Sequence, residues 1–110
     1  MQTGTSPVCR YYIPPLLGNS HFFGRGTQEC DATGVGNPSF VLEDPAFMQV
    51  FLPYFGVCAE GTKPIYRTFS NRADANHRYM TSAALRDAMV ALGWTAEGDG
   101  ADRVVMCAPS

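Results

Sequence analysis

The chain carries the same ordered pattern of residues twice, and this repetition constrains its fold more than any other feature. Each half has an arginine, then a histidine, then a glutamate, each beside aromatic side chains. The matched pairs are Arg10 and Arg67, 57 positions apart, His21 and His77, 56 apart, and Glu43 and Glu97, 54 apart. Such similar spacings indicate duplication of one unit. We expect repeats at residues 7–52 and 64–109, joined by a turn-rich connector at 53–63.

The length of 110 residues suits one domain, expected at residues 7–110, and excludes two catalytic domains of ordinary size. Residues 1–6 are polar and turn-prone, so they are interpreted as a linker remnant. With 45% hydrophobic and 16% charged residues the chain should fold. A formal net charge of -2 argues against a nucleic-acid partner. No apolar run is long enough to predict a membrane span.

Residue alternation predicts the strands. Aromatic and β-branched residues around Arg10 and Arg67 favour half-buried strands, and the segments around His21 and His77 favour their hairpin partners. Further extended sequence lies at residues 39–43 and 47–52 in the first half, and at 93–97 and 103–107 in the second. Each half is therefore expected to run β-β-α-β-β. This order predicts an α+β fold with mainly antiparallel strands around one shared core.

One helix is predicted in each half. In the second half, Thr81 or Ser82 can cap a helix that carries Leu85, Met89 and Leu92 on one face and ends at Gly93. In the first half, residues 27–32 occupy the corresponding place, but glycines 34 and 36 follow soon after. We expect this helix to have at most about two turns.

Four cysteines, an even set in a small domain, predict two disulfides formed in an oxidising compartment. The protein is therefore expected to be secreted or extracellular, with the periplasm or the cell surface as possible locations. A zinc site needs ligands at short spacing, which neither the cysteines nor the two histidines have, so no metal is expected. Three pairings are possible. We favour Cys9 with Cys30 inside the first half, and Cys58 with Cys107, linking the entry of the second half to its last strand.

The repeated motifs read YR-x-F/Y, S/N-H-F/R-F/Y and F/W-x-x-E. They comprise Arg10, Tyr12, His21, Phe23, Phe40, Glu43, Tyr66, Arg67, Phe69, His77, Tyr79, Trp94, Glu97 and Gly98. Across residues 7–109 the chain resembles a tandem aromatic-rich repeat domain of unknown function. The resemblance implies a place at the end of secreted bacterial hydrolases or of surface proteins, with an accessory binding role. The chain departs from the pattern at residues 24–26, where a Thr/Ser-containing helix start is usual, and at Arg78.

The repeated histidines, arginines and glutamates are interpreted as structural. Glu43 is expected to pair with Arg10 or His21, and Glu97 is expected to pair with Arg67 or His77. Ser20 and His21 are adjacent in a strand and should point to opposite faces, which disfavours a catalytic couple. No nucleotide-binding glycine pattern occurs, residues 71–76 favour a turn over a calcium loop, and no cofactor is expected. A small hydrolase using His77 or His21 remains an alternative.

Rings and planar polar groups in the second half favour sugar recognition, in which apolar sugar faces stack on aromatic rings. The expected ligand-binding residues are Trp94, Tyr66, Tyr79, Asn71, Arg72, Asp74, Asn76 and Arg78. We therefore expect a non-catalytic binding module for a cell-wall or extracellular glycan. A protein-binding or adhesion module is the other alternative, with a contact surface made of Phe47, Phe51, Tyr54 and Phe55.

Overall fold

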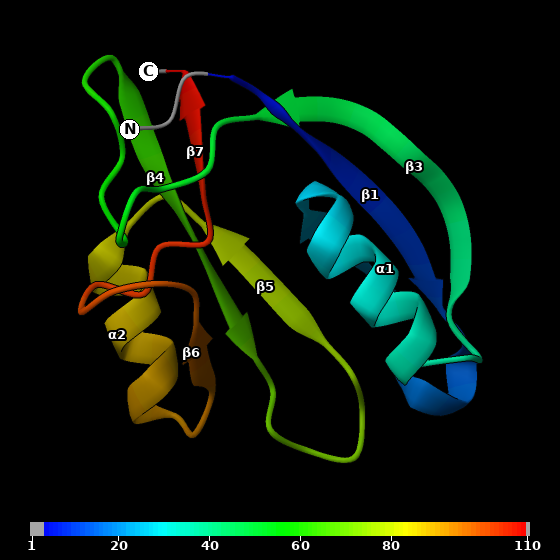
Figure 1. Ribbon diagram of the computed structural model, residues 1–110. Helices are drawn as coiled ribbons and strands as arrows, with labels where there is room; N and C mark the ends of the chain where they lie inside the picture. The colour runs from blue at the N-terminus through cyan, green and yellow to red at the C-terminus, as the bar shows by residue number, and fades with distance from the viewer. Residues whose placement is uncertain (1–3, 110) are drawn as a thin grey trace.

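The computed structural model describes residues 4–109, which form two antiparallel sheets with two helices (Figure 1). In chain order the elements are β1 (Ser6–Ile13), a 3-10 turn (Pro15–Leu17), β2 (Ser20–Arg25), α1 (Gly26–Gly36), β3 (Val41–Val50), β4 (Thr62–Phe69), β5 (His77–Met80), α2 (Ala83–Ala91), β6 (Thr95–Glu97) and β7 (Met106–Pro109). The first sheet has the order β2-β1-β3, and the second has the order β5-β4-β6 with β7 also paired to β4. The expected α+β class is confirmed.

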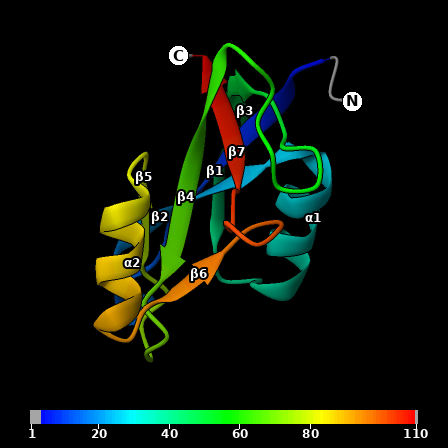
Figure 2. The ribbon, with the colours of Figure 1, turned by 90° about the vertical axis from the view of Figure 1, so that its left-hand side faces the viewer.

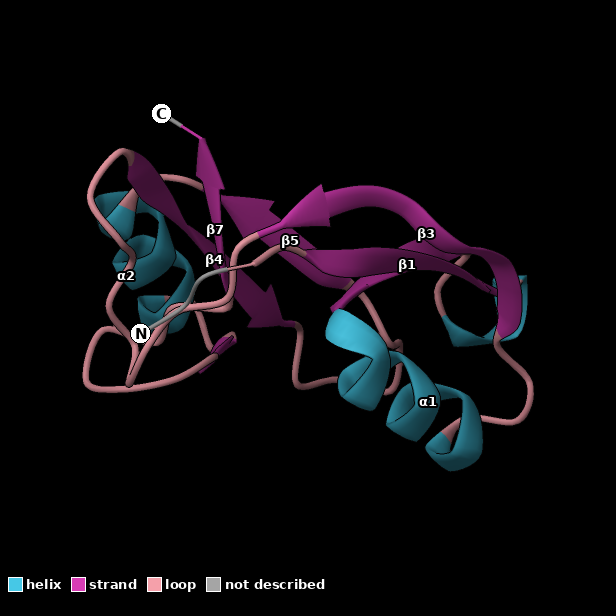
Figure 3. Cartoon of the chain, turned by 45° about the horizontal axis from the view of Figure 1, so that its top comes forward, coloured by secondary structure: helices cyan, strands magenta, loops and turns pink. Residues whose placement is uncertain are grey.

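Each sheet has its own helix. Figures 2 and 3 show α1 and α2 on opposite sides of the molecule, which measures 40 × 32 × 19 Å along its principal axes. The first strand of each half lies between the others, since β1 pairs with β2 and β3, and β4 pairs with β5 and β6. A helix on one side of each sheet leaves the opposite face of that sheet for other contacts.

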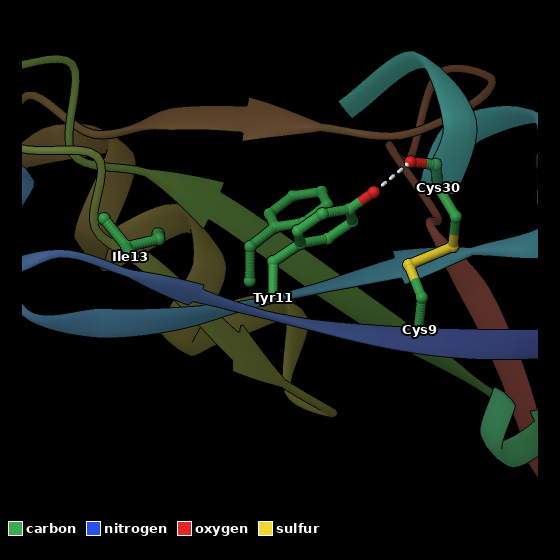
Figure 4. Close-up of a cluster of buried hydrophobic side chains, with 5 residues drawn as sticks. Cys9, Tyr11, Ile13 and Cys30 are labelled. Carbon is green, nitrogen blue, oxygen red and sulfur yellow. Dashed lines mark hydrogen bonds between the residues drawn. A yellow bond between two sulfur atoms is a disulfide. The ribbon is translucent and has the colours of Figure 1, made fainter. Parts of the chain in front are cut away.

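Alternation along β1 divides its side chains between the two faces. Cys9, Tyr11 and Ile13 are buried together with Phe22 and Cys30, as Figure 4 shows for the four that it labels. Val8, Arg10 and Tyr12 therefore lie on the opposite face. The register pairs Arg10 with Phe23 and Tyr12 with His21, so these two β2 residues share that second face.

Helix α1 is longer than predicted, with 11 residues instead of about two turns. The Cys9–Cys30 disulfide ties it to β1, and the Tyr11 hydroxyl donates a hydrogen bond of 2.9 Å to the Cys30 carbonyl (Figure 4). A Cβ atom at Gly34 would lie 2.6 Å from the Tyr11 hydroxyl, so the glycine permits this close approach. Tertiary contacts outweigh the weak helix propensity on which the shorter prediction depended.

The last strand of the first half also differs from the prediction. Residues 39–43 and 47–52 were predicted as two strands, but the structure has one strand, β3, which runs through Pro45. Register shifts between β1 and β3 on both sides of Arg10 absorb the irregularity. The first half therefore runs β-β-α-β, whereas the second half has two strands, β6 and β7, after its helix.

Two strands begin before the repeat bounds expected from the sequence. Strand β1 begins at Ser6, which was assigned to the linker, and β4 begins at Thr62, inside the predicted connector. Residues 1–3 of that linker and residue 110 lie outside the described part of the chain.

The second helix begins and ends where predicted. The Ser82 hydroxyl accepts a hydrogen bond of 3.2 Å from the Leu85 amide, and Gly93 adopts a φ of 104°. Two of the three residues on its predicted apolar face, Leu85 and Leu92, are 59% and 81% exposed. The helix contacts its sheet through Met89, which accepts a hydrogen bond from Thr68, and through Arg86 over the Tyr66 ring.

The favoured disulfide pairing is confirmed, with Cys9 bonded to Cys30 and Cys58 to Cys107. The described residues have three buried clusters in place of one shared core. One is formed by the first half around Tyr11, and another by the second half around Tyr66. The third joins Val8 and Val50 of the first half to Val105 and Met106 of the second.

Candidate functional site

An arginine, a histidine and a glutamate meet on the face of the first sheet that lies opposite α1. Arg10 of β1 donates from Nε to Glu43 Oε1 of β3, at 3.1 Å. His21 of β2 places Nε2 at 3.0 Å from the same oxygen. We call Arg10, His21 and Glu43 the open cluster, because all three side chains are between 34% and 44% exposed.

The second sheet carries the same arrangement. Arg67 of β4 donates from Nε to Glu97 Oε1 of β6 at 2.6 Å, and His77 Nε2 of β5 lies 3.5 Å from that oxygen. We call Arg67, His77 and Glu97 the buried cluster, since the arginine and histidine side chains are only 6% and 10% exposed. Each glutamate thus accepts from the arginine of its own half and lies beside the histidine of that half.

The first half covers the buried cluster. Glu29 of α1 receives two parallel hydrogen bonds from Arg67, Nη1 to Oε1 at 2.9 Å and Nη2 to Oε2 at 2.8 Å. The Phe22 ring lies 4.8 Å from the Arg67 guanidinium carbon, and the Tyr79 hydroxyl bonds both backbone groups of Phe23. This bidentate pair across the two halves is short and geometrically specific.

The ion pairs shift the titration of the groups in and around the buried cluster. Burial alone would raise the pKa of Glu29, but the hydrogen bonds and charge of Arg67 outweigh it and hold that pKa below the usual 4.5. Burial would lower the pKa of Arg67, and the hydrogen bond to Glu29 reverses this, so the net pKa is raised. Glu29 and Arg67 therefore remain charged at neutral pH.

His77 is held in its neutral form. Burial lowers its pKa from 6.5, and the opposing attraction of Glu97 does not restore it. Its Nδ1 lies 2.9 Å from the Ala75 carbonyl, an acceptor, so Nδ1 carries the proton.

Aromatic rings surround the open cluster. The His21 ring lies 5.6 Å from Tyr12 and 6.4 Å from Phe23, with only 21° between the His21 and Phe23 planes. Phe23 contacts Phe47 at 5.4 Å, and the Arg10 guanidinium carbon lies 5.6 Å from the Phe47 ring. We call the open cluster with Tyr12, Phe23 and Phe47 the open platform. Phe23 and Phe47 also line an apolar hollow of about 270 Å³ between the sheets.

The predicted ligand-binding residues do not form one face. Tyr66 is buried at 7% exposure, with Arg86 over its ring. The Tyr79 hydroxyl donates to the Phe23 carbonyl at 2.9 Å and accepts from the Phe23 amide at 2.8 Å. The Tyr66 ring is therefore covered, and the Tyr79 hydroxyl is bonded to the first half. Alternation in the sequence could not distinguish the exposure of Tyr66 and Tyr79 from that of Tyr12 and Phe23, because it depends on how one half docks on the other.

Four polar members of that set, Asn71, Arg72, Asp74 and Asn76, belong to the turn between β4 and β5, and the fifth, Arg78, lies in β5. Asp74 accepts hydrogen bonds from the Ser70 hydroxyl and the Asn76 amide, and its pKa is lowered chiefly by the Ser70 bond. Asn71 adopts a φ of 57°, as turn residues do. Two guanidinium groups, of Arg72 and Arg78, lie 5.5 and 5.8 Å from the Trp94 ring. The Asp74 bonds organise the turn, and both guanidinium groups lie close to the half-buried tryptophan.

The four residues expected to contact a protein partner are also separated. Phe51 packs against the cluster around Tyr66, whereas Phe47 belongs to the open platform. Tyr54 and Phe55 are exposed in the connector, with their rings 4.6 Å apart. A turn closed by mutual backbone hydrogen bonds between Tyr54 and Val57 holds this pair.

A cavity of about 610 Å³ lies beside the start of α1. Its charged groups already bond to one another, since Arg25 donates to both carboxylate oxygens of Asp99 at 2.8 and 2.7 Å. Within residues 4–109 no three His, Cys, Asp or Glu side chains are grouped to hold a metal ion. Ser20 pairs with Ile13 on the α1 side of β2, so its hydroxyl and His21 lie on opposite faces. The open platform is the candidate functional site.

The comparisons with known proteins identify the class of domain but no activity. A family model described as a domain of unknown function (DUF5648) matches residues 1–104, and the chain belongs to this family. No curated protein and no solved structure shows significant similarity to the chain. Across residues 4–109, no helix has the length and apolar character needed to cross a membrane.

Proposed function

We propose that this chain is a non-catalytic, extracellular binding module for a cell-wall or other extracellular glycan, and that the open platform contacts the sugar. The observation that carries the proposal is the exposure of Arg10, His21 and Glu43 between aromatic rings on a sheet face opposite the helix. The proposal moves the ligand site from the second half, where the sequence favoured it, to the first.

The platform has the two kinds of group that sugar recognition uses. Rings such as Tyr12 and Phe47 offer apolar surface for the C–H face of a sugar. Carboxylate, imidazole and guanidinium groups accept or donate hydrogen bonds in fixed planes, which suits ring hydroxyls. Glu43 holds both Arg10 and His21, so the polar groups are positioned before a ligand arrives.

The location and the tandem organisation belong to the same proposal. Two disulfides support an oxidising, extracellular setting. The parallel ion pairs of the open and buried clusters support a duplication of one unit, although one strand follows the helix in the first half and two follow it in the second. We propose a place beside a secreted bacterial hydrolase or in a surface protein, as the sequence resemblance implies.

The exposed Tyr54–Phe55 pair favours a second candidate function, a protein-binding or adhesion module. Phe55 is 81% exposed and adopts a φ of 50°, an uncommon conformation for an aromatic residue. A hydrolase is less favoured, because both repeated glutamates are held in ion pairs and His77 donates its Nδ1 proton to a backbone carbonyl.

Co-sedimentation of the oxidised protein with insoluble peptidoglycan, chitin and cellulose tests the proposal. We expect retention on at least one polymer, lost in Tyr12→Ala and His21→Ala. Trp94→Ala is the matched control, since it removes a ring from the other half. Retention lost only in Trp94→Ala would contradict the assignment of the platform. If no polymer retains the protein and a Phe55→Ala variant loses a protein partner, the second candidate replaces the first.

A further inference from the structure

The open and buried clusters differ in the bonding of the outer nitrogens of their arginines, and this difference points to the chemistry of a ligand. We propose that the outer end of the Arg10 guanidinium binds a carboxylate, so that the glycan recognised by the open platform is an acidic sugar. This inference rests on the glycan-binding function proposed above. It names the chemical class of the ligand and the atoms that select it, Nη1 and Nη2 of Arg10.

The buried cluster shows what such an arginine binds. Arg67 uses Nε for Glu97 of its own half, which leaves Nη1 and Nη2 directed away from that carboxylate. These two atoms bond both oxygens of Glu29, at 2.9 and 2.8 Å. Arg67 thus lies between two carboxylates, one in its own half and one from outside it. The Phe22 ring lies 4.8 Å from the Arg67 guanidinium carbon.

The open cluster has the inner half of this arrangement. Arg10 uses Nε for Glu43, as Arg67 does for Glu97. Among residues 4–109, Nη1 and Nη2 of Arg10 have no acceptor that corresponds to Glu29. The Arg10 side chain is 38% exposed, against 6% for Arg67. Its guanidinium therefore presents its two outer donors to solvent, with the Phe47 ring alongside.

The geometry and charge of these donors favour a carboxylate. A guanidinium donates two parallel hydrogen bonds that match the two oxygens of a planar carboxylate. In the buried cluster Arg67 forms ion pairs with two glutamates, whereas Arg10 forms one, with Glu43, which also lies beside His21. Asp44, opposite Arg10 in the register of β1 and β3, accepts from the Ala46 amide. A uronic acid carries its carboxylate at the edge of an otherwise uncharged ring. Its C–H face can stack on Tyr12 or Phe47 while the carboxylate reaches Arg10.

A glycan array tests the inference. It contains neutral sugars, sulfated sugars, and carboxylated sugars each printed beside its methyl ester, which keeps the ring and removes the charge. We expect carboxylated sugars to bind at least about tenfold more tightly than their esters, as the loss of charge-assisted hydrogen bonds predicts. Arg10→Gln should remove this preference, and Arg10→Lys should keep only part of it, since lysine lacks the paired donors.

The control variant is Arg72→Gln, which removes a surface arginine that is 60% exposed and lies outside the platform. It should keep the full preference. Equal binding of acids and esters would overturn the inference and leave the glycan-binding function in place. A preference for sulfated sugars, or a preference for acids that survives in folded Arg10→Gln, would also overturn it. Binding to no sugar on the array would overturn the proposed function together with the inference.

Discussion

Glu29 makes a specific contact between the two halves, because its carboxylate holds the nearly buried guanidinium of Arg67. Glu29→Gln should lower the free energy of unfolding by about 3 kcal/mol, since it removes one partner of a largely buried pair. Glu43→Gln is the matched control in the open cluster and should cost at most about 1 kcal/mol. Urea denaturation measures both. Equal losses of unfolding free energy in the two variants would contradict a larger contribution from the Glu29–Arg67 pair.

The lowered pKa of His77 predicts how stability changes with pH. Below its ordinary pKa of 6.5, the unfolded chain takes up a proton that the native protein resists, so the free energy of unfolding falls as pH decreases from 6.5. The lowered pKa of Glu29 acts in the same direction, below its ordinary value of 4.5. Unfolding curves recorded from pH 8 to pH 5 should show the first decline, and His77→Asn should make it shallower. An unchanged slope in that variant would contradict the assignment.

Single-residue patterns predicted which groups meet, but not which of them are exposed. Local spacing placed an arginine, a histidine and a glutamate together in each half. Whether Tyr12 or Tyr79 stays open depends on the contact between the halves, where Tyr79 bonds Phe23. No spacing within one strand contains that information, so the sequence could not show which aromatic rings the docking of the two halves covers.

At the scale of elements, α1 contains Gly34 at a position where most helices would have a residue with a side chain. Gly34→Ala should destabilise the protein by about 1 to 3 kcal/mol, because the new Cβ would lie 2.6 Å from the Tyr11 hydroxyl. Gly36→Ala is the matched control in the same helix, where a Cβ meets nothing within 4 Å. It should be neutral or stabilise by up to about 1 kcal/mol. Thermal unfolding of both variants measures the difference, and equal effects would contradict the close packing of α1.

The same helix should respond to reduction. The Cys9–Cys30 disulfide joins α1 to β1, so Cys9→Ala with Cys30→Ala should cost about 2 to 5 kcal/mol and reduce the helical signal in circular dichroism. Cys58→Ala with Cys107→Ala should lower the thermal midpoint and leave α1 intact, since this bond links the connector to β7. A midpoint that is unchanged by reductant would contradict the stabilising role of both bonds.

Element prediction succeeded where the signal was local. The Ser82 cap and Gly93 define α2 without help from the rest of the fold. It failed for α1 and β3, because a disulfide, a tyrosine hydrogen bond and an irregular register set their lengths. These contacts join residues far apart in sequence, which periodicity does not detect.

At the scale of the whole molecule, the first half covers the arginine cluster of the second and leaves its own cluster exposed. Repetition in the sequence implied two similar units, but gave no sign of which would cover the other. The asymmetry arises chiefly from Glu29, which lies outside the repeated motifs, and from Phe22, which stands where the second half has Arg78. Two similar clusters thus take different roles, one holding the halves together and one available to a ligand.

An NMR titration of the ¹⁵N-labelled protein, with soluble fragments of the polymer that retains it, locates the ligand-binding residues. Amide shifts should concentrate at Arg10, Tyr12, His21 and Glu43 in the first sheet and saturate with ligand. Residues around Trp94 should remain unchanged. Saturable shifts confined to the Trp94 turn, or to Tyr54 and Phe55, would contradict the assignment of the open platform as the binding face.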